Sequence, residues 1–356
     1  MNILITAPSL DPTKNVSGIG TIVNTIMKNN GKQRYFHYLL GRPDDPSNKL
    51  SWLIQVIKQL CAFPFFVKRN RIDIVHQNLP FDPKGLAREY IINSWCRLLK
   101  VPAVLHIHGG VFLMKKTTNP LFFKISKSLF KHSKQVIVLS EIETQSLAEN
   151  YGFKNAFVLP NSIDIAEYET KEKKINLQYP TFLFLGRIHE SKGIEEIISA
   201  LKKLKKHQLF KFIACGNGPL KDQLVANCEM ILGENFEYAG IVSGTQKIDI
   251  IKKADFFLLP SRYGEGLPMA LLETMANGVI PIVTNDASMK YIIKSGINGI
   301  CVNKNDPEDL YEKMCTVVSD ESLSNLLSIK ATETIAEKYN IDDYIKKLNA
   351  IYNLSQ

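Results

Sequence analysis

The sequence predicts an α/β protein built from two doubly wound parallel sheets. Short apolar runs alternate with amphipathic segments along all 356 residues, and the runs lack a clean period of two. This pattern is typical of strands buried on both faces of a parallel sheet and joined by crossover helices. A chain of this length also exceeds one ordinary domain. We therefore expect two Rossmann-like domains that face each other across a cleft.

Ten apolar runs are expected to be strands, in two series of five. The first series lies at 3–6, 72–76, 103–107, 136–139 and 156–159, and the second at 182–185, 210–214, 256–259, 279–283 and 300–302. Between them lie helical segments such as 194–204, whose apolar residues fall on one face. Ligands of such sheets bind beyond the carboxyl ends of the strands, so the loops that follow strands are the places to search for a site.

The two series are separated by a charged stretch, Glu167–Lys174, which has no apolar periodicity. We therefore predict an N-terminal domain at 1–165, a linker at 166–180 and a C-terminal domain at 181–340. The tail, 341–356, has apolar residues at helical spacing. It is expected to form a separate helix that can cross back to the first domain.

The net charge of +9 is unevenly distributed. Residues 1–165 hold 21 basic and 10 acidic side chains, whereas the rest of the chain holds 23 basic and 25 acidic ones. Such asymmetry indicates that the first half faces an anionic partner, either nucleic acid or an anionic membrane. The sequence contains neither a transmembrane run nor a signal-peptide pattern, which predicts a cytoplasmic protein. Its six cysteines form no C-x-x-C pair, which predicts free thiols rather than a zinc site.

The segment Ser261–Glu273 offers two carboxylates close to a predicted helix start. Pro268 suits the first helical position, so the backbone N–H groups of Gly266 and Leu267 can point at an anion such as a diphosphate. Glu265 and Glu273 can accept paired hydrogen bonds from sugar or ribose hydroxyls. The alternative is that Glu265 only complements the helix dipole and that Glu273 is solvated.

Two cations follow the first strand of the second domain. Arg187 and Lys192 can neutralise a diphosphate leaving group without a metal ion. A solvated basic loop is the alternative. We expect the side chains of Lys192 and Glu265 to be exposed in the cleft.

The first domain offers a glycine-rich turn and a histidine. Gly18 precedes a helix expected from Thr21, where backbone can approach a phosphate, although a plain helix cap explains the turn equally well. His106 and His108 share one face of a strand, and His108 lies nearer the strand end. A structural histidine is the alternative, and no third ligand at metal spacing supports zinc.

Together these features resemble glycosyltransferase family 4, a retaining family with the GT-B fold. The matching positions are the glutamate pair Glu265 and Glu273, the basic pair Arg187 and Lys192, Gly18, His108, the segment 159–164 and the G-x-G-P turn that begins at Gly216. The chain departs from the family pattern at Ser17, Ser162, and Leu267 with Pro268, and these changes remove no charged group.

The resemblance implies a retaining glycosyltransferase that moves a sugar from a nucleotide sugar to a glycan or lipid-linked acceptor in cell-surface polysaccharide synthesis. It implies catalytic roles for Glu265, Arg187, Lys192 and His108, and donor binding by Gly18, Glu273, Gly266, Leu267 and Gly216. It implies no cofactor and no metal. The enzyme is expected in the cytoplasm, where it can bind the anionic inner face of the membrane.

Three alternatives stay open on the residues alone. A nucleotide-sugar epimerase or an inverting enzyme would keep the same fold. A dehydrogenase would need a fuller glycine fingerprint than the first loop provides. A non-catalytic nucleic-acid-binding protein would explain the basic half, although no recognised nucleic-acid motif is present.

Overall fold

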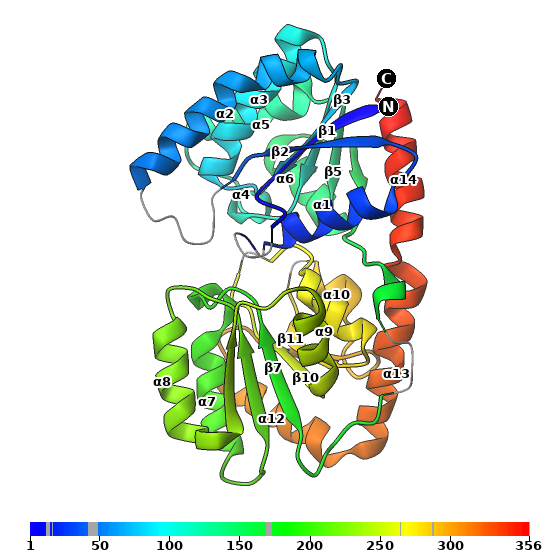
Figure 1. Cartoon of the computed structure of the whole chain (residues 1–356). Coiled ribbons are helices and arrows are strands. Elements are labelled where there is room, and N and C mark those ends of the chain that lie inside the picture. The colour runs from blue at the N-terminus through cyan, green and yellow to red at the C-terminus, as the bar shows by residue number, and fades with distance from the viewer. Residues whose placement is uncertain are drawn as a thin grey trace. The chain divides into compact units, whose positions relative to one another are not determined.

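The computed structural model describes residues 1–11, 15, 17–41, 49–168, 173–263, 265–286 and 288–355. The chain divides into two compact units, which are coloured by residue number in Figure 1. Unit 1 comprises Met1–Ser162 together with Ile341–Gln356, and unit 2 comprises Ile163–Asn340. The predicted linker, 166–180, belongs to unit 2, and its residues 169–172 lie outside the described part of the chain.

Unit 1 contains a six-stranded, wholly parallel sheet of order β2-β1-β3-β4-β5-β6. Its strands are β1 (Asn2–Ala7), β2 (Arg34–Leu39), β3 (Ile74–Leu79), β4 (Ala103–Ile107), β5 (Gln135–Val138) and β6 (Ala156–Val158). Its helices are α1 (Gly18–Asn29), α2 (Lys49–Arg69), α3 (Pro83–Leu99), α4 (Val111–Met114), α5 (Pro120–His132), α6 (Glu141–Tyr151) and α14 (Ile341–Leu354).

Unit 2 repeats this architecture with the order β12-β11-β10-β7-β8-β9, again wholly parallel. Its strands are β7 (Thr181–Leu185), β8 (Lys211–Cys215), β9 (Phe236–Gly240), β10 (Phe256–Leu259), β11 (Ile280–Thr284) and β12 (Ile300–Val302). Its helices are α7 (Ile194–Leu204), α8 (Lys221–Leu232), α9 (Gly244–Lys253), α10 (Met269–Ala276), α11 (Met289–Ile292), α12 (Pro307–Ser319) and α13 (Glu321–Lys338). The prediction of two parallel α/β sheets is confirmed.

All ten predicted strands exist, but two further strands were missed. These are β2 and β9, and each lies at an edge of its sheet. Most of their residues are only partly buried, because an edge strand has a neighbour on one side alone. Their sequences, RYFHYL and FEYAG, are therefore not continuous apolar runs of the kind that marks a central strand.

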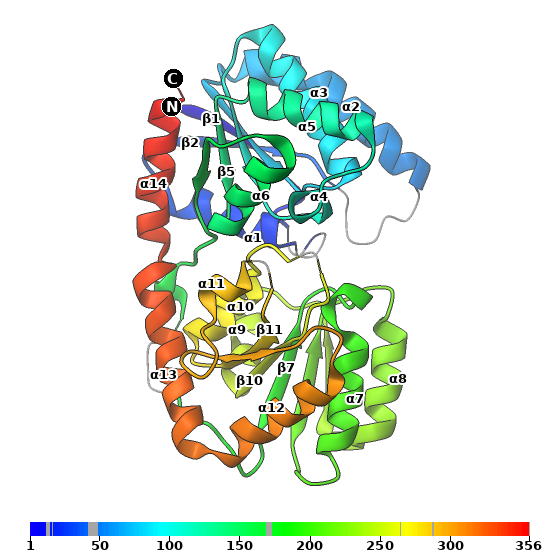
Figure 2. The ribbon, with the colours of Figure 1, turned by 180° about the vertical axis from the view of Figure 1, so that it is seen from behind.

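The C-terminal helix crosses back to unit 1, as the tail pattern allows. Its apolar face is buried, and the Tyr352 hydroxyl lies 2.6 Å from Nδ1 of His76 in β3. Oδ1 of Asn349 accepts hydrogen bonds from Asn30 and Gln33, each at 3.0 Å. Unit 1 is therefore built from both ends of the described chain, and Figure 2 shows α14 beside β1 and β2.

Candidate functional site

The loops at the carboxyl ends of β7, β8 and β10 are tied together in unit 2. The amide of Ile188 donates to the carbonyl of Asn217 at 3.0 Å, which joins the loop after β7 to the loop after β8. The amide of Arg262 donates to the carbonyl of Ser191 at 2.8 Å, which joins the loop after β10 to the loop after β7. The segments predicted to bind the donor therefore converge at one edge of the sheet.

Glycine is required where these loops approach each other. Gly216 has φ of +128°, and a Cβ there would lie 1.8 Å from the carbonyl oxygen of Gly186. Gly193 has φ of +71°, and its Cβ would lie 2.2 Å from the carbonyl oxygen of Pro260. Any side chain at either position would force the loops apart. Gly216, for which donor binding is a prediction, has a packing role in the structure.

Glu265 is held by two partners from the converging loops. It forms an ion pair with Lys192, which ends the 3₁₀ turn Glu190–Lys192, and it accepts a hydrogen bond from the Ser261 hydroxyl at 2.6 Å. Lys192 stays partly exposed, but Glu265 is only 7% exposed. The expectation of an exposed Glu265 is therefore wrong, because the loops close around the carboxylate and its two donors replace water.

Glu273 is equally enclosed. It lies inside α10, is 3% exposed and pairs with the Lys247 ammonium of α9 at 2.6 Å. The alternative of a solvated Glu273 is therefore wrong. Pro268 takes the cap position with an extended ψ of 127°, so α10 begins at Met269 and not at Pro268 as predicted.

The remaining candidates of unit 2 are Arg187 in the loop after β7, and Gly266 and Leu267 in the loop after β10. Arg187 is exposed in the loop after β7, and no ion-pair partner for it is found within the described ranges. Gly266 is partly exposed, whereas Leu267 is 4% exposed immediately before α10. Arg187 can therefore offer its guanidinium to a ligand without breaking an ion pair.

Gly18 opens α1 in unit 1. The Ser17 hydroxyl caps this helix by accepting a hydrogen bond from the amide of Gly20 at 3.2 Å. The helix starts three residues before the predicted Thr21, because Ser17 already satisfies a first-turn donor. The helix cap proposed as the alternative is therefore present. Gly18 is exposed at the N-terminus of α1.

His108 follows β4 and is fixed by Asn78 at the end of β3. Its Nε2 lies 2.7 Å from Oδ1 of Asn78, whose Nδ2 donates to the carbonyl of Thr6 at 2.7 Å. The amide orientation follows from this second bond, since a flipped amide would set two acceptors against each other. Nε2 of His108 is therefore the protonated nitrogen, and Nδ1 carries the lone pair.

His108 ends a row of three histidines with low pKa values. Its ring centroid lies 4.1 Å from that of His106, as expected for two residues on one strand face, and Nδ1 of His106 lies 3.2 Å from Nε2 of His76. Burial lowers the pKa of His76 and of His108 to about 3, and lowers that of His106 well below its usual value. All three rings are therefore neutral at physiological pH.

Three residues of these networks were missed by sequence reasoning: Ser261, Lys247 and Asn78. Ser261 begins the glutamate segment, so its distance of four residues from Glu265 was an available signal. Lys247 is 26 residues from Glu273 and Asn78 is 30 from His108, so only the parallel topology brings them together.

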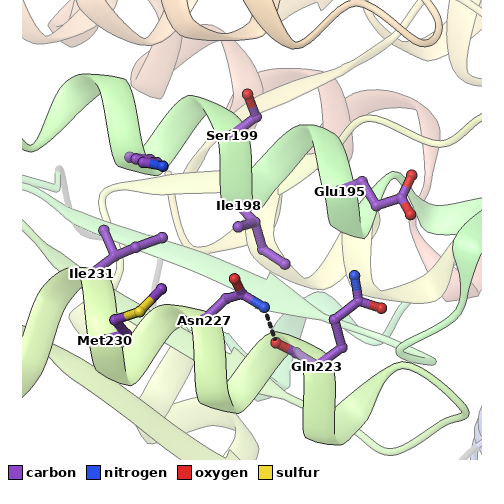
Figure 3. A pocket seen from close by; sticks show the side chains of 8 residues that line it. Glu195, Ile198, Ser199, Gln223, Asn227, Met230 and Ile231 are labelled. Atoms are coloured by element: carbon purple, nitrogen blue, oxygen red, sulfur yellow. Dashed lines mark hydrogen bonds between the residues drawn. The ribbon is translucent and has the colours of Figure 1, made fainter.

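A separate groove of about 260 Å³ lies between α7 and α8 (Figure 3). Its lining contains none of the predicted site residues and consists of Glu195, Ile198, Ser199, Lys202, Gln223, Asn227, Met230 and Ile231. The parts of the chain described by the structure contain no group of three His, Cys, Asp or Glu side chains able to hold a metal ion.

Family models match nearly the whole chain. Residues 165–352 match the model described as glycosyl transferases group 1, and residues 29–167 match the model of glycosyltransferase family 4. The first match alone covers more than half of the chain, and its span contains every site candidate of unit 2.

Relatives and solved structures agree with these matches. An Escherichia coli UDP-Gal:α-D-GlcNAc-diphosphoundecaprenol α-1,3-galactosyltransferase is 25% identical over 319 residues, which are 84% of this chain and 80% of that protein. Sucrose-phosphate synthase from Thermosynechococcus elongatus superposes with a TM-score of 0.79 at 14% identity, covering 99% and 98% of the two chains. Anabaena HepE in complex with UDP-glucose gives 0.78 at 13% identity, covering 99% of each.

Proposed function

This chain belongs to glycosyltransferase family 4, and we propose that it transfers a hexose from a uridine diphosphate sugar to a lipid-linked saccharide during cell-surface polysaccharide synthesis. The enzyme is a glycosyltransferase with two Rossmann-like units. The uridine donor is suggested by the UDP-glucose complex of HepE and by the UDP-galactose named for the E. coli relative. The lipid-linked acceptor is suggested by the diphosphoundecaprenol in the same relative's name.

One observation carries this proposal: two buried carboxylates, Glu265 in the loop after β10 and Glu273 in α10, are each paired with a lysine. Burying a charge costs free energy unless partners compensate it. The pairs Glu265–Lys192 and Glu273–Lys247 supply this compensation, unlike ion pairs between fully exposed side chains. Such preorganised charges stabilise charge that develops in a transition state.

We assign Glu265 to the transferred sugar and Glu273 to the donor ribose. The Glu265 carboxylate would contact sugar hydroxyls and stabilise positive charge near the anomeric carbon. The Lys192 ammonium has three N–H donors and shares one with Glu265, so two remain for the departing diphosphate. Arg187 adds a planar fork that fits phosphate oxygens.

His108 and Gly18 would act from unit 1. The tautomer fixed by Asn78 leaves Nδ1 of His108 as an acceptor for a substrate hydroxyl. Gly18 would offer exposed backbone to a phosphate or acceptor at the start of α1.

We also propose that transfer is retaining and needs neither metal nor cofactor. In this mechanism the acceptor hydroxyl attacks the anomeric carbon from the face on which the diphosphate leaves. The proton of that hydroxyl passes to a phosphate oxygen of the leaving group. The charge of the leaving group would be met by Arg187 and Lys192.

A donor screen tests the proposal directly. UDP-, GDP- and ADP-sugars are compared for thermal stabilisation of the protein and for hydrolysis, and the anomer released is determined by NMR. We expect stabilisation and turnover with a UDP-sugar and retention of the anomeric configuration. Turnover with GDP- or ADP-sugars alone would refute the uridine assignment, and an inverted product would refute the retaining mechanism.

The epimerase and nucleic-acid-binding alternatives gain no support from the relatives. No helix in the described part of the chain is long and apolar enough to cross a membrane. We propose peripheral binding to the cytoplasmic face of the membrane, where a lipid-linked acceptor would be within reach.

A further inference from the structure

We propose that α2, α3 and α5 of unit 1 form one surface that docks on an anionic lipid bilayer. The three helices lie side by side, with α3 packed between α2 and α5 (Figures 1 and 2). We call their outward surface the basic helical face. Its exposed basic side chains are Lys58, Lys68 and Arg69 on α2, Lys84 and Arg97 on α3, and Lys124, Lys127 and Lys131 on α5.

The basic helical face carries no exposed acid. Glu89 is the one acidic residue in the sequences of the three helices, and it is 0% exposed. Its carboxylate is bound by Arg88 at 2.9 Å and by the Gln77 amide at 2.9 Å. The outward charge of the face is therefore positive throughout. A solvated helix surface usually mixes both signs, so this segregation calls for an anionic partner.

Large apolar side chains are exposed among these basic residues. The most exposed are Leu98 at 72%, Phe65 at 69% and Leu121 at 61%, one on each helix. Ile54 and Ile57 extend the stripe on α2. Such a mixture fits the boundary between lipid headgroups and acyl chains. There the apolar side chains enter the hydrocarbon, and the lysine ammonium groups meet the lipid phosphates.

The same features argue against nucleic acid as the occupant. A phosphate backbone would satisfy the lysines but would offer nothing to Leu98, Phe65 and Leu121. Two of its three most exposed apolar side chains, Leu98 and Leu121, are aliphatic and cannot stack on bases as the aromatic side chains of a single-strand-binding surface do. An anionic bilayer satisfies both the charge and the apolar groups.

The inference rests on the proposed function only for the reason why the enzyme would dock: a lipid-linked acceptor resides in a bilayer. The charges and exposed apolar side chains of the basic helical face do not depend on that function. The inference also assigns the anionic partner that the charge of residues 1–165 predicts to one surface of unit 1.

Vesicle flotation of the full chain tests the inference. Vesicles of equal parts phosphatidylglycerol and phosphatidylcholine are compared with vesicles of phosphatidylcholine alone. We expect binding to the former only, weakening as salt is added. Each basic residue near an anionic leaflet contributes about fivefold to partitioning, so Lys124→Glu, Lys127→Glu and Lys131→Glu together should lower it by about a hundredfold or more.

A matched variant distinguishes an effect of the basic helical face from an effect of the protein's net charge. Lys202→Glu, Lys206→Glu and Lys253→Glu change the same total charge on exposed lysines of unit 2. This control should partition within about twofold of wild type. Equal loss in both triple variants, or no binding of wild type to anionic vesicles, would overturn the inference.

Two further measurements complete the test. Phe65→Ser with Leu98→Ser should abolish the binding that persists at high salt, since apolar contacts are not screened; unchanged binding would remove the apolar part of the proposal. Preferential binding of duplex or single-stranded DNA over anionic vesicles would overturn it. UDP-sugar hydrolysis is measured on every variant. Hydrolysis without vesicle binding would refute this inference alone, whereas vesicle binding without hydrolysis would refute the proposed function alone.

Discussion

Replacing Glu265 by glutamine should separate the charge of this residue from its packing. Glutamine keeps the side chain's shape, and its carbonyl oxygen can still accept from the Ser261 hydroxyl and from Lys192. What is lost is the negative charge that the proposed mechanism sets beside the developing positive charge of the sugar. One preorganised electrostatic contact is worth about 3 to 4 kcal/mol in a transition state, so we expect kcat to fall about a hundredfold to a thousandfold.

The folded state should respond much less to this change. The glutamine keeps both hydrogen-bond partners, so the free energy of unfolding should change by about 1 kcal/mol. Glu265→Ala would instead leave Ser261 without its acceptor in a buried place and should cost about 1 to 3 kcal/mol. The alanine variant is therefore the poorer test of catalysis.

The assay pairs initial rates of UDP-sugar turnover with thermal unfolding. Glu308→Gln is the control, because Glu308 forms an exposed ion pair with Lys203 in the same unit. Exposed pairs contribute about 0 to 1 kcal/mol, so this control should retain both turnover and stability. A folded Glu265→Gln enzyme with turnover within about fivefold of wild type would refute the assignment of Glu265.

Three further outcomes follow from the same networks. Turnover should persist in excess EDTA, because cationic side chains supply the positive field; loss in chelator that magnesium or manganese restores would contradict this. Asn78→Ala should lower kcat by about tenfold and mix the two tautomers of His108, which ¹⁵N NMR distinguishes. Asn78→Asp should preserve the Nε2–H tautomer. A single tautomer with full activity in the alanine variant would argue against a positioning role for Asn78. Because the pKa values of His76 and His108 are about 3 when folded and about 6.5 when unfolded, the unfolded state binds more protons between these values. Stability should therefore be full above pH 6.5 and fall with decreasing pH, by about 1.4 kcal/mol per pH unit for each histidine, and a flat urea-unfolding profile from pH 6.5 to 5 would contradict the burial argument.

The sequence predicted the central part of each sheet better than its edges. Helices α7 and α14 were anticipated from apolar periodicity, since their buried residues fall on one face. Strands β2 and β9 were not, because an edge strand need not be continuously apolar. The start of α1 was misplaced because Ser17 was not assigned its role as the helix cap.

The site was predictable as positions but not as contacts. Loops after parallel strands meet at one edge, so the convergence around Lys192 and Glu265 follows from topology. The burial of Glu273 does not, since it depends on Lys247 from a separate helix. Nothing in the local sequence of His108 indicated Asn78, because neighbouring strands are matched only once the sheet register is known.

Unit 1 cannot finish folding until the ribosome has synthesised all of unit 2, because α14 follows unit 2 in the chain. Unit 2 is continuous in sequence and can fold as one piece. Until α14 has been synthesised, the surface of unit 1 that binds it stays uncovered. At a synthesis rate of about 5 to 20 residues per second, the wait is roughly 10 to 35 seconds. During it His76 lacks Tyr352, and apolar surface of α1 stays uncovered. A nascent chain held in this state is an expected client for chaperones, and losing residues 341–356 would damage unit 1 rather than unit 2.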